Sequence, residues 1–224
     1  MEVQEVILAR AIRLVKVSAV VSYWPDIVEK LGTEYSFARL PDVREILSSQ
    51  NRGAAKGAEF RVGKFMRSDK TEALIDRFTL FNDGLVADCR TSTDDCDLFL
   101  DSIAVWAKEH LSGIKNIGKS LYLSQMEVKF GVHKYAQGFD RLGQQVSGLI
   151  EKYGAIPGIG RFGFSSLAVS VEPGGLPNTQ PSPFTIERRS NTRFDEDVFF
   201  AQAPLRTSDH RDLLAGLEQL LASI

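Results

Sequence analysis

Hydrophobic and polar positions alternate along this chain in an order of elements that occurs twice. Short apolar or alternating runs predict strands, and apolar residues three and four positions apart predict helices. In the first half these patterns predict a strand at 6–17, a helix that begins at Pro25, a strand at 59–66, a hairpin at 73–90 and a helix at 93–111.

Two of these predictions have clear local support. The hairpin contains Asn82, Asp83 and Gly84, which tolerate the positive φ angles of a tight turn. The helix that follows has an apolar stripe at helical spacing. The stripe consists of Cys96, Phe99, Leu100, Ile103, Ala107 and Leu111.

The second half repeats the order. It predicts a strand at 120–130, a long helix at 133–153, a strand at 161–172, a hairpin at 184–204 and a leucine-rich final helix. Strands that come as hairpins, separated by helices, indicate a mainly antiparallel sheet with helices packed on one face.

We therefore expect an α+β fold made of two similar β-α-β-β-β-α halves. The first half would cover 1–113 and the second 114–224, joined as one continuous structural unit. The order of elements suggests an internal duplication.

A short sequence, Arg-Thr-Ser, precedes the last helix of each half. It occurs at 90–92 and again at 206–208. Serine and threonine hydroxyls satisfy free N–H groups at a helix start, and the aspartates that follow are favoured at the positive end of the helix dipole. The repeat therefore indicates helix capping rather than a catalytic signature.

Composition and charge narrow the class of protein. The chain has 224 residues with a formal net charge of −2, and its isoelectric point of about 6.0 argues against a dedicated nucleic-acid domain. No apolar run has the roughly 20 residues that span a bilayer. The two cysteines, Cys89 and Cys96, form no disulfide framework. We expect a cytoplasmic protein without membrane partners.

Three aspartates, Asp94, Asp97 and Asp101, share one face of the predicted helix. Carboxylates in this arrangement could bind a hard cation. They also lie at a helix start, where aspartate is favoured without any ligand. Since no second group of ligands is visible, the sequence favours a solvated face, and we expect no metal and no cofactor.

Other chemical motifs are weak. The glycines of "GIGRFG" at 158–163 match a dinucleotide fingerprint, but they follow a helix and enter a strand, which is the reverse of the required context. Cys96 with one of the histidines, His110, His133 or His210, could supply a nucleophile and base. Because Cys96 belongs to the apolar stripe, a core position is the better interpretation.

The strongest local charge lies at 50–70. We expect Arg52, Lys56, Arg61 and Lys64 to form a basic binding segment for an anionic partner. Nucleic acid is one possible partner. Another is a second copy of the chain, because 83–101 carries six aspartates and one arginine.

The sequence favours a non-enzymatic interaction or scaffold protein that self-associates or binds a macromolecular partner. This prediction depends on the lack of a coherent catalytic set in the sequence. The alternative is a small-ligand-binding protein, or an enzyme, with a pocket between sheet and helices. Such pockets are mainly apolar and leave little trace in a sequence.

Overall fold

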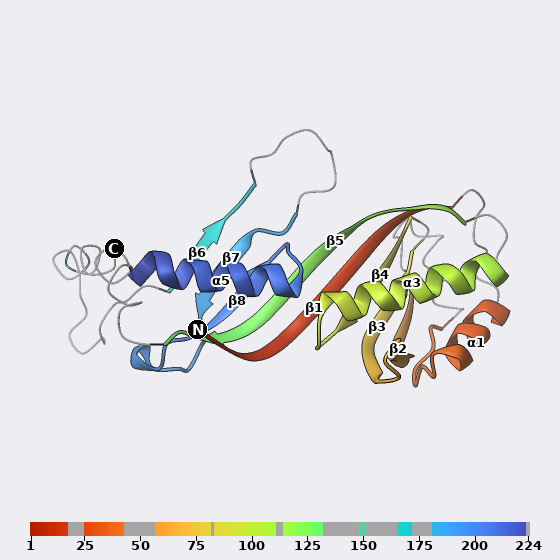
Figure 1. The fold of residues 1–224 in the computed structure, drawn as a ribbon, viewed down its shortest axis with the longest axis horizontal. Coiled ribbons are helices and arrows are strands. Elements are labelled where there is room, and N and C mark those ends of the chain that lie inside the picture. Colours follow the sequence, from red (N-terminus) through yellow and green to blue (C-terminus); the bar gives the residue numbers. More distant parts are fainter. Residues whose placement is uncertain are drawn as a thin grey trace. The chain divides into compact units, whose positions relative to one another are not determined.

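A computed structural model gives the fold (Figure 1). It describes residues 1–17, 25–42, 57–81, 83–110, 114–131, 165–171 and 181–222, and the single positions 148 and 150. The described residues form a mainly antiparallel sheet of eight strands with three α-helices. The predicted α+β class is confirmed.

The helices and strands follow one another as the local patterns require. In chain order they are β1 (Glu2–Val17), α1 (Pro25–Glu34), β2 (Ala58–Met66), β3 (Glu72–Leu80), β4 (Gly84–Cys89), α3 (Thr93–His110), β5 (Ile114–Lys129), β6 (Ser166–Val169), β7 (Phe184–Arg188), the 3-10 turn η1 (Phe194–Glu196), β8 (Val198–Ala203) and α5 (Thr207–Ala222).

The sheet has the strand order β2-β3-β4-β1-β5-β8-β7-β6. Pairing is antiparallel between β2 and β3, β3 and β4, and β4 and β1, and again between β6 and β7 and between β7 and β8. From one edge to the centre of the sheet the strands are β2-β3-β4-β1, and from the other edge to the centre they are β6-β7-β8-β5.

Elements with strong local signals are placed as predicted. The β3–β4 hairpin closes where Phe81 donates its N–H to the carbonyl of Gly84 at 2.8 Å. Helix α3 matches its prediction within one residue, whereas β1 and β5 begin several residues earlier than predicted. The helix predicted at 133–153 lies almost wholly outside the described residues, and the internal duplication stays a prediction.

Both Arg-Thr-Ser segments lie at helix starts: 90–92 directly precedes α3, and α5 begins within 206–208, at Thr207. Ser92 Oγ accepts a hydrogen bond from the N–H of Asp95 at 3.1 Å, which is N-capping geometry. The first residues of α3 and α5 also bond to each other. Thr93 Oγ1 accepts from Thr207 N–H at 2.9 Å, and Thr207 Oγ1 accepts from Thr93 N–H at 3.0 Å.

The chain divides into two compact units that interleave in sequence. The first unit consists of Met1–Ile7, Gln125–Pro204 and Ser208–Ile224, and the second of Leu8–Ser124 and Leu205–Thr207. The long strands β1 and β5 therefore contribute residues to both units. Each unit has its own core.

The core of the second unit is aromatic. The rings of Phe60, Phe78 and Phe37 pack against one another, with ring centroids 5.2–6.3 Å apart, and Phe99 of α3 meets Phe78 edge-on at 5.3 Å. Tyr35 meets Phe99 at 5.1 Å just after the end of α1. Helices α1 and α3 consequently cover the same face of this unit's strands (Figure 1).

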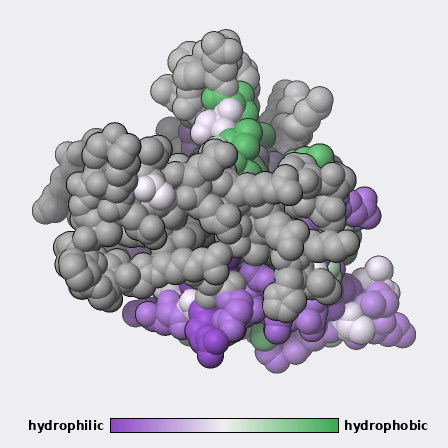
Figure 2. All heavy atoms as spheres, turned by 90° about the vertical axis from the view of Figure 1, so that its left-hand side faces the viewer, coloured by the Kyte–Doolittle hydropathy of each residue, from purple (hydrophilic) through white to green (hydrophobic). Residues whose placement is uncertain are grey.

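Among the described residues, the core of the first unit includes a buried stretch of β5. Met126, Val128 and Phe130 pack with Ile186, Phe199, Ala201 and Leu214. Among the described residues visible in Figure 2, hydrophilic side chains predominate and hydrophobic ones gather in small areas. In that view, the described residues form no broad hydrophobic patch.

Candidate functional site

A lateral row of charged side chains crosses four strands of the second unit. Arg61 of β2 lies opposite Arg77 of β3, Arg77 lies opposite Asp88 of β4, and Asp88 lies opposite Arg10 of β1. Directly opposed residues in antiparallel strands share one face of a sheet. We call these four residues the arginine row.

The arginine row lies on the face opposite α3. Asp88 is flanked by Ala87 and Cys89, and Arg10 by Ala9 and Ala11. All four neighbours are fully buried. Since successive side chains of a strand point to opposite faces, the row points away from the core. Among the described residues of this unit, no helix covers that face.

The centre of the row is a buried carboxylate held by two guanidinium groups. Arg10 donates to both oxygens of Asp88 at 2.7 and 3.0 Å, and Arg77 donates to Asp88 Oδ2 from two nitrogens at 2.9 and 2.6 Å. The Asp88 side chain is only 4% exposed because the arginines cover it. Such charge-assisted pairs fix the geometry of the face.

Two of the four predicted binding residues, Arg61 and Lys64, are placed on this face. Arg61 pairs with Glu59 at 2.6 Å, and Lys64 pairs with Glu72 at 3.1 Å. Both cations are about half exposed. The other two predicted residues, Arg52 and Lys56, lie outside the described residues.

Exposed aliphatic side chains accompany these charges. Lys64 lies opposite Leu74, and Met66 lies opposite Glu72. Leu74, between the buried residues Ala73 and Ile75, is 54% exposed, and Met66 is 58% exposed. Together with the arginine row, Glu59, Lys64, Met66, Glu72 and Leu74 form what we call the open face.

The aspartates of α3 have internal arginine partners. Arg13 binds Asp97 at 3.1 Å and Asp101 at 2.5 Å, and Arg206 binds Asp94 at 2.6 Å and Asp97 at 2.9 Å. No group of three or more potential metal ligands occurs among the described residues. The guanidinium groups of Arg13 and Arg206 lie where a bound metal ion would contact these carboxylates.

Most of the aspartate-rich segment is also paired within the chain. Asp88, Asp94, Asp95, Asp97 and Asp101 each bind an arginine. The expected docking of a basic segment onto 83–101 of another copy would have to compete with these pairs.

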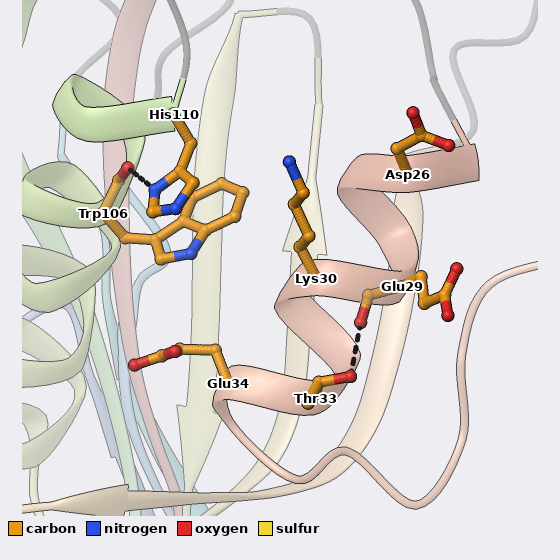
Figure 3. Close-up of a pocket in the computed structure, with 7 residues that line it drawn as sticks. All are labelled: Asp26, Glu29, Lys30, Thr33, Glu34, Trp106 and His110. Carbon is orange, nitrogen blue, oxygen red and sulfur yellow. Dashed lines mark hydrogen bonds between the residues drawn. The ribbon is translucent and has the colours of Figure 1, made fainter.

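A hollow lies between α1 and the end of α3, with a volume of about 480 Å³ (Figure 3). Lys30 and Glu34 extend from α1 toward α3. On α3 the rings of Trp106 and His110 stack with centroids 4.7 Å apart. Asp26, Glu29 and Thr33 complete the lining. Apart from Trp106, every lining side chain is exposed.

The structure gives little support to Cys–His catalysis. Cys96 is fully buried, as its place in the apolar stripe predicts. His210 is buried on α5, and His110 contacts Trp106 at the end of α3. His133 and the glycine motif at 158–163 lie outside the described residues. Cys96 instead contacts Cys89.

The sequence contained a weak signal for the arginine row. Arg10, Arg61 and Asp88 each stand between two apolar or small residues of a strand, as a charge on an outward position should, whereas Arg77 follows the exposed Asp76. The lateral alignment of the four residues depends on register across strands that are far apart in the chain. Periodicity alone does not fix that register.

No protein-family model and no curated protein matches the chain. Within the described part of the chain, none of the helices combines the length and apolar character needed to cross a bilayer.

Proposed function

We propose that this protein is a non-enzymatic interaction protein that self-associates through the open face of its second unit. The observation that carries the proposal is the arginine row on a sheet face that no described helix covers. Arginine and methionine are enriched at protein interfaces, whereas an isolated monomer gains little from exposing Leu74 and Met66 together.

The chemistry of the open face favours a protein partner over nucleic acid. Its apolar members are aliphatic, namely Met66 and Leu74, and sheets that bind single-stranded nucleic acid use aromatic side chains on which bases stack. Every cation of the row also has a carboxylate neighbour, which weakens its attraction for phosphate. The net charge of −2 also disfavours binding to nucleic acid.

A second copy of the chain is the partner that these charges fit. In a two-fold dimer the same patch meets itself, so it must be self-complementary. The open face carries the cations Arg10, Arg61, Lys64 and Arg77 and the anions Glu59, Glu72 and Asp88. Nearly balanced charges with aliphatic side chains between them meet that condition.

The test is sedimentation velocity of the full chain across a range of protein concentrations. We expect wild type to associate reversibly. Leu74→Asp places an unpaired carboxylate in the middle of the proposed interface, so the dissociation constant should rise at least about tenfold. Circular dichroism checks that the variant remains folded.

Val105→Asp is the matched control, because Val105 is 56% exposed on α3 and lies on the helical side of the same unit. It should leave association unchanged. A wild-type protein that is monomeric at its highest soluble concentration would contradict the proposal. If the Leu74→Asp variant still associates as wild type does, the interface lies on another surface.

The alternative function, a small-ligand-binding protein or enzyme, would use the hollow between α1 and α3. Ligand pockets are mainly apolar and enclose their ligands. The hollow has one buried side chain, Trp106, and its other lining groups are solvated charges, a hydroxyl and an imidazole. We therefore favour the interaction function.

We also propose that the two halves of the chain are copies of one ancestral unit. The strand orders β2-β3-β4-β1 and β6-β7-β8-β5 and the reciprocal Thr93–Thr207 bonds support this proposal. A duplicate would place a helix at 133–153, in the position that α1 has in the first half. An experimental structure with an extended chain at 133–153 would contradict it.

A further inference from the structure

Two thiols meet in the interior of the second unit. Cys89 is the last residue of β4, and Cys96 lies in the first turn of α3. The sulfur atoms of Cys96 and Cys89 are 3.3 Å apart, within hydrogen-bond distance of each other. Both side chains are fully buried.

Polar groups surround these sulfur atoms, unlike those of ordinary core cysteines. Cys89 Sγ lies 3.3 Å from Thr91 Oγ1 and 3.2 Å from the carbonyl oxygen of Ser92. Cys96 Sγ also contacts the carbonyl oxygen of Ala9 at 3.3 Å. The carbonyl oxygens accept from a protonated thiol, whereas hydrogen bonds from Cys96 and from the backbone of Thr91 and Ser92 favour the Cys89 thiolate.

We propose that Cys89 and Cys96 form an oxidisable dithiol, which a small hydroperoxide such as hydrogen peroxide converts to an intrachain disulfide. The contact between the sulfur atoms carries the proposal, since the resolving thiol is already beside the attacking one. The proposal is independent of the open face, because both side chains are in the core.

The two thiols have different parts in this chemistry. A hydrogen bond from Cys96 lowers the pKa of the Cys89 thiol to about 7, against the opposing effect of burial, and backbone hydrogen bonds from Thr91 and Ser92 add to the lowering. The neighbouring Cys89 sulfur, together with burial, raises the pKa of Cys96. Cys89 is therefore the attacking thiol and Cys96 the resolving thiol.

The reaction balances in two steps. The Cys89 thiolate attacks one peroxide oxygen, the O–O bond breaks, and the leaving hydroxide takes a proton to become water. This step leaves a sulfenic acid on Cys89. The Cys96 sulfur then attacks Cys89 Sγ, the S–O bond breaks, and a second water leaves with the Cys96 proton. Two thiols lose two electrons and two protons, and one peroxide becomes two waters.

Access to Cys89 is through the segment that follows β4. Thr91 is exposed to solvent and touches Cys89 Sγ, so its side chain separates the sulfur from water. Thr91 is held by a hydrogen bond to Asp95, which Arg67 binds through two nitrogens. Since both sulfur atoms are buried, a peroxide reaches Cys89 when this segment opens locally.

The test is intact-mass analysis of the full native chain after treatment with hydrogen peroxide and then alkylation in denaturant. We expect a mass lower by two hydrogen atoms, no alkylation, and a cross-linked peptide that contains Cys89 and Cys96. These are the only cysteines of the chain, so a non-reducing gel distinguishes the intrachain bond from a bond between two chains.

Two variants separate the roles. Cys96→Ser should stop at the sulfenic acid, which dimedone traps on Cys89. Cys89→Ser should slow the loss of the remaining thiol by about tenfold or more at neutral pH, because Cys96 stays protonated. Alanine replaces serine where a serine variant fails to fold. Folded wild type that keeps both thiols alkylatable after peroxide, or that accumulates sulfinic acid without a disulfide, overturns the proposal.

Discussion

In the second unit, arginine side chains pair with buried and half-buried aspartates. Arg67 donates to both oxygens of Asp95, at 2.5 and 2.8 Å, and these hydrogen bonds hold the pKa of Asp95 below its usual range. Burial alone would raise the pKa of Asp97, but hydrogen bonds from Tyr122, Ser120 and Arg13 lower it. Guanidinium groups suit this role because they stay charged and offer several donors in a plane.

A histidine in the first unit gives the first prediction at the scale of single residues. His210 is fully buried on α5, and its ring meets Phe184 edge-on at 6.3 Å. Burial lowers the pKa of His210 to about 4, from about 6.5 for an exposed imidazole. Between these two pH values the unfolded chain binds a proton that the folded chain does not.

The folded state should therefore lose stability as the pH falls from about 6.5 to about 4. The full loss is on the order of 3 kcal/mol, which corresponds to a pKa difference of roughly 2.5 units. Urea unfolding at several pH values measures it. His210→Gln, which does not titrate there, is the control and should show a flatter profile.

The titration of Asp95 and Asp97 does not overlap with that of His210. Asp95 and Asp97, with lowered pKa values, stabilise the fold at neutral pH and lose that contribution only as the pH falls below about 4. A wild-type free energy of unfolding that is constant from pH 7 to pH 4.5 would show that the buried His210 ring is not kept neutral.

Two threonines at helix starts bond to each other within the second unit. Thr93 and Thr207 begin α3 and α5, and each hydroxyl accepts the backbone N–H of the other residue. Both residues are buried, so water cannot replace these bonds. An N–H group left without a partner in such a place costs about 1–3 kcal/mol.

We expect Thr93→Val and Thr207→Val each to lower the free energy of unfolding by about 1–2 kcal/mol. Valine keeps the shape of threonine and removes the acceptor, so packing changes little. Chemical denaturation measures the effect. Thr33→Val is the control: Thr33 is exposed on α1, and its change should stay within about 0.5 kcal/mol. Equal effects at all three positions would contradict the role of the reciprocal bonds.

The elements show what could be predicted from the sequence. The β3–β4 hairpin and helix α3 were predictable because turn residues and an apolar stripe act over a few positions. The Thr93–Thr207 bonds join residues 114 positions apart, and Arg13 and Asp101 are 88 apart. Such contacts depend on strand register, which local periodicity does not determine. The same reason hid the arginine row. The Cys89–Cys96 contact is local, and it depends on how the chain turns from β4 into α3 over seven residues.

At the scale of the whole molecule, the nearly equal numbers of acidic and basic side chains affect how strongly two copies attract each other. With 27 basic and 29 acidic side chains, two copies repel each other weakly. Attraction between them then depends on local complementarity, and the open face provides both signs of charge. Such contacts weaken in salt, because the Debye length falls from about 10 Å at 0.1 M to about 3 Å at 1 M.

The last prediction separates the two pairs of basic residues that the sequence suggested for binding. Arg61→Ser with Lys64→Ser should weaken self-association and reduce its dependence on salt, because both cations lie on the open face. Arg52→Ser with Lys56→Ser removes the same charge at two positions that the definition of the open face does not include, and we expect a smaller effect. Sedimentation velocity in a salt series measures both variants beside wild type. A larger effect of the Arg52 and Lys56 substitutions would place the interface on the 52–56 segment. Association that does not depend on salt in any of the three proteins would rule out these cations as interface residues.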